Sequence, residues 1–152
     1  MKIGLISDTH GLLRPDALAA LQGCDQLIHA GDIGKPEILD ALRQLAPLSA
    51  VRGNNDHGDW ADELPHSLEL ECQGVRIFVV HEPAHLPPDL VERGLRVAIC
   101  GHSHKPLIEE KHGLLLLNPG SAGPRRFKLP IALGLLHIDN GEPRAELIEL
   151  AV

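Results

Sequence analysis

The first third of the chain alternates short apolar runs with segments of helical spacing. The apolar runs predict strands over residues 2–6, 26–30 and 49–52. The segments between them predict helices over residues 15–21 and 36–45. Pro15 and Pro36 stand at the start of these helices, where the missing N–H of proline is harmless. Such alternation of strand and helix favours a parallel βαβ sheet with the helices on its outer face.

From residue 67 onward the pattern changes to closely spaced strands. They are predicted over residues 67–72, 75–80, 96–100, 107–110, 114–118, 131–138 and 145–150. Residues such as Gly74, Gly113 and Asn140 between them are typical of tight turns, because they accept positive φ at low cost. Only 89–93 reads as a helix in this half. Too few helices remain to cover one flat sheet, so we expect two mixed sheets packed face to face with helices outside.

Length and composition predict one domain with an aliphatic core. The 152 residues give room for a single compact domain over 1–152, and 43% of them are hydrophobic. The chain has two Phe, one Trp and no Tyr, but ten His. Histidines in this number are not explained by core packing.

Five clusters of metal-type ligands follow predicted strands. They are Asp8-Thr9-His10, Gly31-Asp32, Gly53-Asn54-Asn55-Asp56, Val80-His81 and Gly101-His102-Ser103-His104. Open α/β sheets bind ligands at the carboxyl ends of their strands, so these five segments should converge. The sequence therefore predicts a dinuclear metal site.

Each cluster taken alone also has a plain structural interpretation. Asp8 and His10 can belong to a capped turn, and Asp32 can cap a helix. Asn54 can be a turn residue, and His81 a surface histidine. All five together, with carboxylate, imidazole and amide ligands, favour Mn²⁺, Fe, Zn²⁺ or Ni²⁺ over Ca²⁺.

The spacing of two within the first and last clusters suggests how their ligands are presented. Asp8 and His10, and likewise His102 and His104, should leave the same side of an extended backbone. Each pair can then hold one ion or two adjacent ions.

The order of these clusters resembles that of the calcineurin-like metallophosphoesterases. It is most similar to their small, cap-less phosphodiesterase branch, of which Asn118-Pro119-Gly120-Ser121 is also typical. The resemblance extends from residue 1 to about residue 126. It implies an α/β (α+β) fold, a four-layer α/β/β/α sandwich of two mixed sheets with helices outside.

The resemblance also implies the ligand sets and the cofactor. One metal would take Asp8, His10, Asp32 and His104, and the other Asp32, Asn54, His81 and His102. Asp32 would bridge two divalent transition-metal ions, which we expect to be Mn²⁺, with Ni²⁺, Zn²⁺ or Fe as alternatives. Asn54 and His81 would act directly at the catalytic centre. Asp56 would orient a neighbouring group there through a hydrogen bond.

Two positions depart from the pattern of the family. Glu82 follows His81 where glycine is common, so it adds either a carboxylate close to the ligands or only a bulkier loop. Asn55 stands where larger relatives place histidine and several small ones place cysteine. The usual proton donor is therefore absent from its usual place, and a water or His57 remains as a possible source of the proton.

The segment 118–126 has two interpretations. Its Pro and Gly residues favour a rigid loop. Alternatively, Arg125 or Arg126 binds a phosphate oxygen of the substrate through its planar guanidinium. The remaining histidines, His29 among them, and Trp60 carry no motif and are assigned to the surface or to packing.

The expected function is hydrolysis of small or activated phosphate diesters by direct attack of a metal-bridging hydroxide. A catalytically weak scaffold protein is the first alternative, since a eukaryotic trafficking subunit resembles this branch. Complete ligand positions favour the enzyme over that scaffold. A nuclease is the second alternative, but the net charge of −7 and the lack of a basic tract make nucleic acid an unlikely partner.

The sequence also suggests where the protein works. Its three cysteines form no CxxC pair, and no apolar run reaches the roughly 18 to 20 residues of a membrane span. With no signal-peptide pattern at its start, the chain is expected to be cytoplasmic and to have no membrane partner. A homo-oligomer stays possible.

Overall fold

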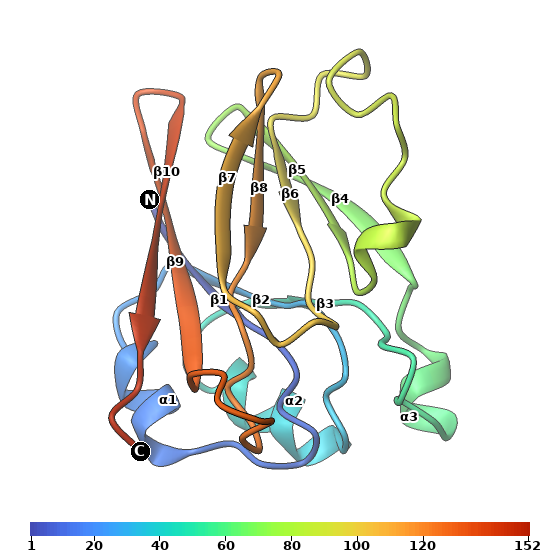
Figure 1. Cartoon of the computed structure of the whole chain (residues 1–152), viewed down its shortest axis with the longest axis vertical. Coiled ribbons are helices and arrows are strands. Elements are labelled where there is room, and N and C mark those ends of the chain that lie inside the picture. The colour runs from blue at the N-terminus through green and yellow to red at the C-terminus, as the bar shows by residue number, and fades with distance from the viewer.

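The computed structural model describes residues 1–152 and contains two five-stranded sheets (Figure 1). The strands are β1 (Lys2–Ile6), β2 (Gln26–His29), β3 (Leu48–Ala50), β4 (Ser67–Cys72), β5 (Val75–Val80), β6 (Val97–Ile99), β7 (Leu107–Lys111), β8 (Leu114–Asn118), β9 (Ala132–Asp139) and β10 (Glu142–Glu149). The helices are α1 (Pro15–Ala20), α2 (Pro36–Arg43), α3 (Asp59–Asp62) and the short 3₁₀-helix η1 (Pro83–His85). The predicted strands and the two predicted N-terminal helices are all present, within a few residues at their ends.

Both sheets are mixed, as the sequence predicts. The first has the order β10-β9-β1-β2-β3, and the second has the order β4-β5-β6-β8-β7. In the first sheet β1, β2 and β3 are parallel, and in the second β5, β6 and β8 are parallel. The other strands of each sheet are antiparallel to their neighbours. The carboxyl ends of these three parallel strands therefore lie together at one edge of each sheet.

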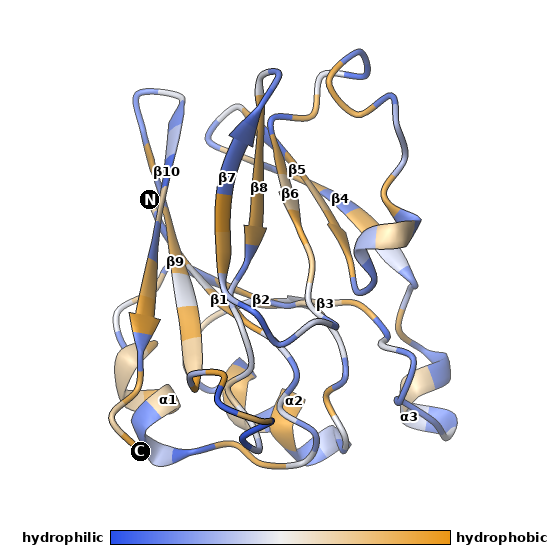
Figure 2. Ribbon diagram, in the orientation of Figure 1, coloured by the Kyte–Doolittle hydropathy of each residue, from blue (hydrophilic) through white to orange (hydrophobic).

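An aliphatic core fills the space between the two sheets. It contains Ile3, Leu5 and Ile28 from the first sheet and Ile77 and Val97 from the second, all buried. Figure 2 shows that apolar residues follow the strands of both sheets, while the hairpin ends and many loops are polar. With almost no aromatic residues, the core depends on β-branched and leucine side chains, as composition predicts.

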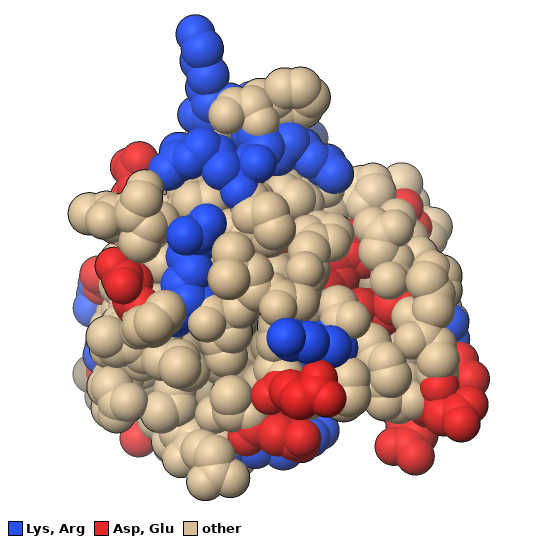
Figure 3. Space-filling model, turned by 90° about the horizontal axis from the view of Figure 1, so that it is seen from below, with Lys and Arg blue, Asp and Glu red and all other residues tan.

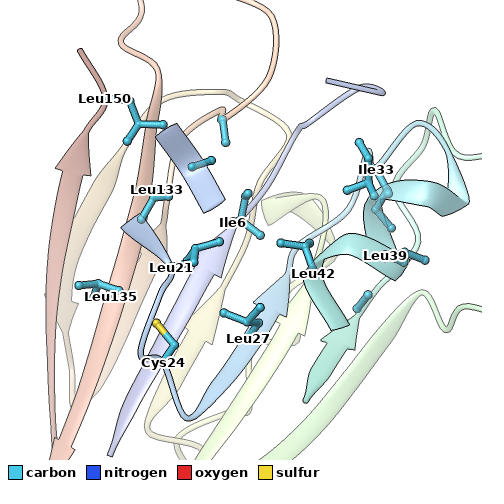
Figure 4. Packing of buried hydrophobic residues seen from close by; sticks show 14 of the residues in the cluster. Ile6, Leu21, Cys24, Leu27, Ile33, Leu39, Leu42, Leu133, Leu135 and Leu150 are labelled. Atoms are coloured by element: carbon cyan, nitrogen blue, oxygen red, sulfur yellow. The ribbon is translucent and has the colours of Figure 1, made fainter. Parts of the chain in front are cut away.

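The helices α1 and α2 cover the outer face of the first sheet. Leu39 and Leu42 of α2 pack into a buried cluster with Ile6 and Leu27 of the sheet (Figure 4). Leu21, just after α1, joins the same cluster. Complete burial of a leucine or isoleucine side chain contributes about 1.5–3 kcal/mol.

An irregular segment forms the outer layer over the second sheet, and the predicted helix over 89–93 is wrong. Residues 88–94 form turns, in which Leu90 and Leu95 are buried against Phe78 and Ala98. Only a few residues separate the Pro87-Pro88 pair from Gly94, which has a φ of +88°. A regular helix has no room to propagate there.

Three hairpins close with the left-handed turns that the sequence suggests. Gln73-Gly74, His112-Gly113 and Asn140-Gly141 all have positive φ at both residues. Two successive positive φ values define the type I′ turn, whose twist matches that of the flanking strands.

The short helix α3 is absent from the sequence prediction. Its Trp60 is half-buried and packs against the same cluster as α2. None of the helices could span a bilayer, since the longest, α2, has eight residues.

Candidate metal centre

The predicted ligand clusters all lie at the carboxyl ends of parallel strands. Asp8, Asp32 and Asn54 follow β1, β2 and β3, whereas His81 and His102 follow β5 and β6. Adjacent loops are joined through their backbones, since Asp8 N donates to Gly31 O at 3.0 Å and Gly101 N donates to His81 O at 2.9 Å. Each sheet therefore supplies part of one continuous site.

Five of the seven predicted ligands, including both pairs spaced by two, lie on left-handed rather than extended backbone, which corrects the sequence-based expectation. The φ values of Asp8, His10, Asp32, His102 and His104 lie between +45° and +73°. Non-glycine residues adopt such values rarely and at a cost. The chain must turn sharply straight after each strand, and the turn directs these side chains toward a common centre.

The first cluster is formed by Asp8, His10 and His104. Oδ1 of Asp8 lies 3.8 Å from Nε2 of His10 and 3.4 Å from Nε2 of His104. The two imidazole Nε2 atoms are 3.3 Å apart. The other oxygen of Asp8, Oδ2, accepts hydrogen bonds from the Ser7 hydroxyl and from His102 N. Oδ1 is thereby left for a cation.

The second cluster is formed by Asp8, Asp32 and His81. Nδ1 of His81 lies 2.7 Å from the carbonyl oxygen of Ala30, to which it donates as N–H. In the neutral ring Nε2 then carries a lone pair, and it faces Oδ2 of Asp32 at 3.2 Å and Oδ1 of Asp8 at 3.9 Å. A lone pair directed at two carboxylates is unfavourable unless a proton or a metal ion lies between them.

The pKa of His81 reflects this arrangement. Burial alone would lower it, but the carboxylates of Asp32 and Asp8 close to the ring raise it above the ordinary value. The carboxylates thus stabilise positive charge at this position.

His102 and Asn54 extend the chain of ligands beyond His81. Nδ1 of His102 lies 3.3 Å from Oδ1 of Asn54, and its ring meets that of His81 edge-on at 5.3 Å. All seven side chains predicted as metal ligands therefore lie in one connected group.

Asp32 is held by the loop that contains Asn54. The backbone N–H of Asn55 donates to Oδ1 of Asp32 at 2.9 Å, and its side-chain amide donates to Oδ2 at 3.0 Å. Burial would raise the pKa of Asp32, yet the adjacent His81 imidazole and the hydrogen bonds from Asn55 hold it well below its usual range. Asn55 is thus a donor to Asp32, a role that the sequence analysis did not foresee.

Asp56 fixes the backbone around Asp32. Its carboxylate accepts hydrogen bonds from the backbone N–H groups of Asp32 at 3.0 Å, Gly53 at 2.8 Å and Gly34 at 3.0 Å. It lies buried behind Asp32 and orients the chain there.

Neighbouring residues approach the glycines of the motifs so closely that no side chain fits at these positions. A Cβ on Gly31 would lie 2.7 Å from Nδ1 of His81, and one on Gly53 would lie 2.2 Å from both N and Oδ1 of Asp32. A Cβ on Gly101 would lie 2.1 Å from the hydroxyl of Ser7.

His29, assigned from sequence to the surface or to packing, is fully buried beneath the site. Gly31 N donates to its Nδ1 at 3.1 Å, so its Nε2 carries the proton and donates to the Thr9 hydroxyl at 3.0 Å. The Thr9 hydroxyl donates in turn to Ile33 O at 2.8 Å. Burial lowers the pKa of His29 to about 3. A neutral imidazole thus joins the loop of Asp8 to the loop of Asp32.

The segment 118–121 braces the loops of both sheets. The side-chain amide of Asn118 donates to Gly101 O at 2.9 Å and to the Ser103 hydroxyl at 3.1 Å. The Ser121 hydroxyl donates to Asp8 O at 3.1 Å. These contacts agree with the rigid loop that the sequence suggests.

The two arginines predicted to bind substrate lie on an exposed loop. Arg125 donates hydrogen bonds to the backbone oxygens of Leu129 and Val152. Both arginines are exposed to solvent. On the face shown in Figure 3, most basic side chains lie together at the upper edge. The acidic side chains lie in separate groups over the rest of this face. Substrate binding by these arginines stays a prediction.

The donor set fits divalent transition-metal ions. Carboxylate oxygens, imidazole nitrogens and one amide oxygen are their usual protein ligands. Oδ1 of Asp8, Nε2 of His81 and Nδ1 of His104 are buried and have no hydrogen-bond partner within the protein. A buried polar atom left in this way costs about 1–3 kcal/mol, which coordination to an ion would offset.

Two stacked mixed sheets with such a cluster at their common edge define a metallophosphoesterase-like protein. The chain belongs to the calcineurin-like phosphoesterase superfamily, whose domain description matches residues 1–141. The family resemblance inferred from the motifs is thereby confirmed.

Individual relatives agree with this assignment. A probable metallophosphoesterase of Methanothermobacter thermautotrophicus is 36% identical over 97% of this chain and 92% of its own length. The structure of a novel archaeal phosphodiesterase superposes with a TM-score of 0.80 at 26% identity, covering 97% of this chain and all of that one. Vps29 of Chaetomium thermophilum shares the fold, with a TM-score of 0.78 at 21% identity over 99% of this chain and 97% of its own.

Proposed function

We propose that this protein is a metal-dependent phosphodiesterase that hydrolyses small or activated phosphate diesters. The observation that carries the proposal is the lone pair of His81 Nε2, which faces the carboxylates of Asp8 and Asp32. This arrangement is built for a cation. The names of the relatives, a probable metallophosphoesterase and a phosphodiesterase, support hydrolysis of phosphate esters as the reaction.

Two metal ions per chain account for the ligands best. Oδ2 of Asp32 lies 3.6 Å from His10 Nε2 and 3.2 Å from His81 Nε2, so its carboxylate stands between the two sets of imidazoles. Asp32 would bridge the ions, with Asp8, His10 and His104 on one side and Asn54, His81 and His102 on the other. Oδ1 of Asp8 also approaches His81, so it can assist in the bridge.

The residues around the ions would perform the binding and orienting steps. When bound, such ions lower the pKa of a water and stabilise the negative charge of a phosphate group. Asp56 holds the backbone of Asp32, and His29 keeps the two neighbouring loops in register. Arg126 is free to contact an anionic group of the substrate. Mn²⁺ is the ion we expect, because imidazoles together with carboxylates suit transition metals better than Mg²⁺.

The complete ligand set favours this enzyme over a scaffold protein. A structure that served only as an interaction platform would have no need for two unpartnered buried atoms, Oδ1 of Asp8 and Nε2 of His81, that face each other at 3.9 Å. The net charge of −7 argues against a nuclease function, since binding of nucleic acid depends on basic surfaces.

The test is metal stripping followed by reloading with Mn²⁺, Ni²⁺, Zn²⁺ or Mg²⁺. Hydrolysis of bis(4-nitrophenyl) phosphate should disappear on chelation and return with a transition metal. In the matched pair Asp32→Asn and Asp56→Asn, metal content measured by elemental analysis should fall much further for the first, which removes a ligand charge. Full activity after exhaustive chelation would refute the proposal, and equal metal content in the two variants would refute the bridging role of Asp32.

A further inference from the structure

A small polar pocket opens beside the metal ligands on the side of the second sheet. Asn54 and His81 line it on the side of the metal centre. The other lining residues are Arg52, Gly53, His66, Val80, Glu82 and His85. Only one apolar residue, Val80, contributes to its lining. A group bound in this pocket would therefore lie next to the metal centre and contact mainly hydrogen-bonding side chains.

The size of the pocket limits what it can hold. Its volume is about 180 Å³, whereas pockets that enclose drug-sized molecules measure about 300–1,000 Å³. It can take one small part of a substrate, such as a short alcohol, but it cannot enclose a nucleoside. Because seven of its eight lining residues are polar, charged or glycine, a hydroxylated group finds hydrogen-bonding partners there that an aromatic ring would leave unused.

Glu82 organises one side of this pocket. Its Oε2 lies 3.3 Å from Nδ1 of His85, and its Oε1 lies 3.7 Å from Nε2 of His102. The carboxylate thus lies beside Nδ1 of the exposed His85 ring and leaves Nε2 as the ring atom available to a ligand. An imidazole with a carboxylate beside one nitrogen is a common arrangement for proton transfer from the other.

We propose that this pocket receives the leaving alcohol of the substrate, a small hydroxylated alcohol, and that His85 donates a proton to it. The proposal rests on the function proposed above. A water oxygen forms the new bond to phosphorus and loses one proton to solvent as the ester P–O bond breaks, and the electron pair of that bond stays on the alcohol oxygen. The proton on Nε2 of His85 moves to this oxygen, and solvent afterwards restores the proton to the imidazole.

The other candidate donors are less well placed. The side-chain amide of Asn55 donates to Asp32 and has no acidic proton to transfer. His57 does not line the pocket. Arg52, which does line it, is fixed by its hydrogen bonds to Asp56 O and to Asp62. His66 lines the pocket as well, but Glu82 lies beside His85 and makes no ion pair with His66.

The experiment compares diesters that share a methyl group and differ in the second alcohol. Methyl 4-nitrophenyl phosphate has a leaving group that departs unaided, whereas methyl glyceryl phosphate needs a proton. His85→Gln should slow the glyceryl ester by about 10²-fold or more, the usual contribution of general-acid catalysis. The nitrophenyl ester should change by less than about threefold. His57→Gln is the matched control and should leave both rates unchanged.

A binding measurement tests the pocket without turnover. In the zinc-loaded protein, glycerol 3-phosphate should shift the imidazole ¹⁵N resonances of His85 and leave those of His57 in place. Equal slowing of both esters in His85→Gln, or an unmoved His85 resonance, would overturn the inference. If the loaded wild-type protein hydrolyses no diester, the proposed function fails, and the resonance shift alone then decides whether the pocket binds such an alcohol phosphate.

Discussion

At the scale of single residues, His29 has the most consequence among the residues that carry no motif. It is fully buried, and each ring nitrogen is used once, as acceptor from Gly31 and as donor to Thr9. This pattern requires the neutral tautomer, so a second proton would break the bond from Gly31. Burial also disfavours the charged imidazolium, which lowers the pKa of His29 to about 3.

We therefore predict that acid destabilises the metal-free protein through His29. The unfolded chain takes up a proton near pH 6.5, whereas the folded chain does so only near pH 3. Between these values the unfolded state binds more protons, so the free energy of unfolding falls as the pH falls, by up to about 1.4 kcal/mol per pH unit. Urea denaturation from pH 7 to pH 4 measures this slope.

His29→Gln is the variant that isolates the effect. Loss of the buried hydrogen bonds should lower its stability at pH 7 by about 1–3 kcal/mol. Its stability should then fall less steeply with acid than that of the wild type. Parallel pH profiles for the two proteins would contradict the assignment.

At the scale of elements, the strand ends position the site and the loops after them shape it. Strand and helix patterns, early prolines and turn glycines were sufficient to predict the parallel strands and the edge at which the ligands meet. The left-handed conformations of Asp8 and His102 were not predictable, because they depend on contacts between loops distant in sequence. The same holds for Asn55, whose donation to Asp32 joins two such loops. The misassigned helix over 89–93 had only a short local pattern in its favour.

The loop of Gly53 packs so tightly against Asp32 that a larger residue at this position should disturb the metal site. Gly53→Ala would place a methyl group within 2.2 Å of Asp32, so the loop must shift and metal affinity should fall by about tenfold or more. Gly134→Ala is the control, since a Cβ there meets its neighbours at an ordinary 3.5 Å. Isothermal titration with Mn²⁺ compares the two, and an unchanged affinity for Gly53→Ala would contradict the crowding.

At the scale of the whole molecule, the metal centre joins the two sheets. Asp8, Asp32 and Asn54 come from the first sheet, and His81, His102 and His104 come from the second. An ion held by both groups binds only when the sheets are packed together. Metal binding should thus stabilise the fold as a unit and not one sheet alone.

Thermal unfolding tests this coupling. At a metal concentration 100 times the dissociation constant, binding adds about 2.7 kcal/mol, which for a chain of this size is roughly 5–10 °C in Tm. Asp32→Asn in the first sheet and His81→Gln in the second should each remove most of this gain. His112→Gln, at the tip of the β7–β8 hairpin, should keep it. A full gain in either ligand variant would show that one sheet binds the metal by itself.

Trp60 gives this protein a built-in optical reporter. The chain has no Tyr and no other Trp, so its ultraviolet emission comes from this one indole. Trp60 lies on α3, four residues beyond Asp56, in the segment that leaves the metal centre. Ordering of the loop 53–58 around an ion should change the environment of the half-buried ring. We expect the emission to shift when metal-free protein is titrated with Zn²⁺, and to stay unchanged in Asp32→Asn, so that occupancy of the site can be followed without a label.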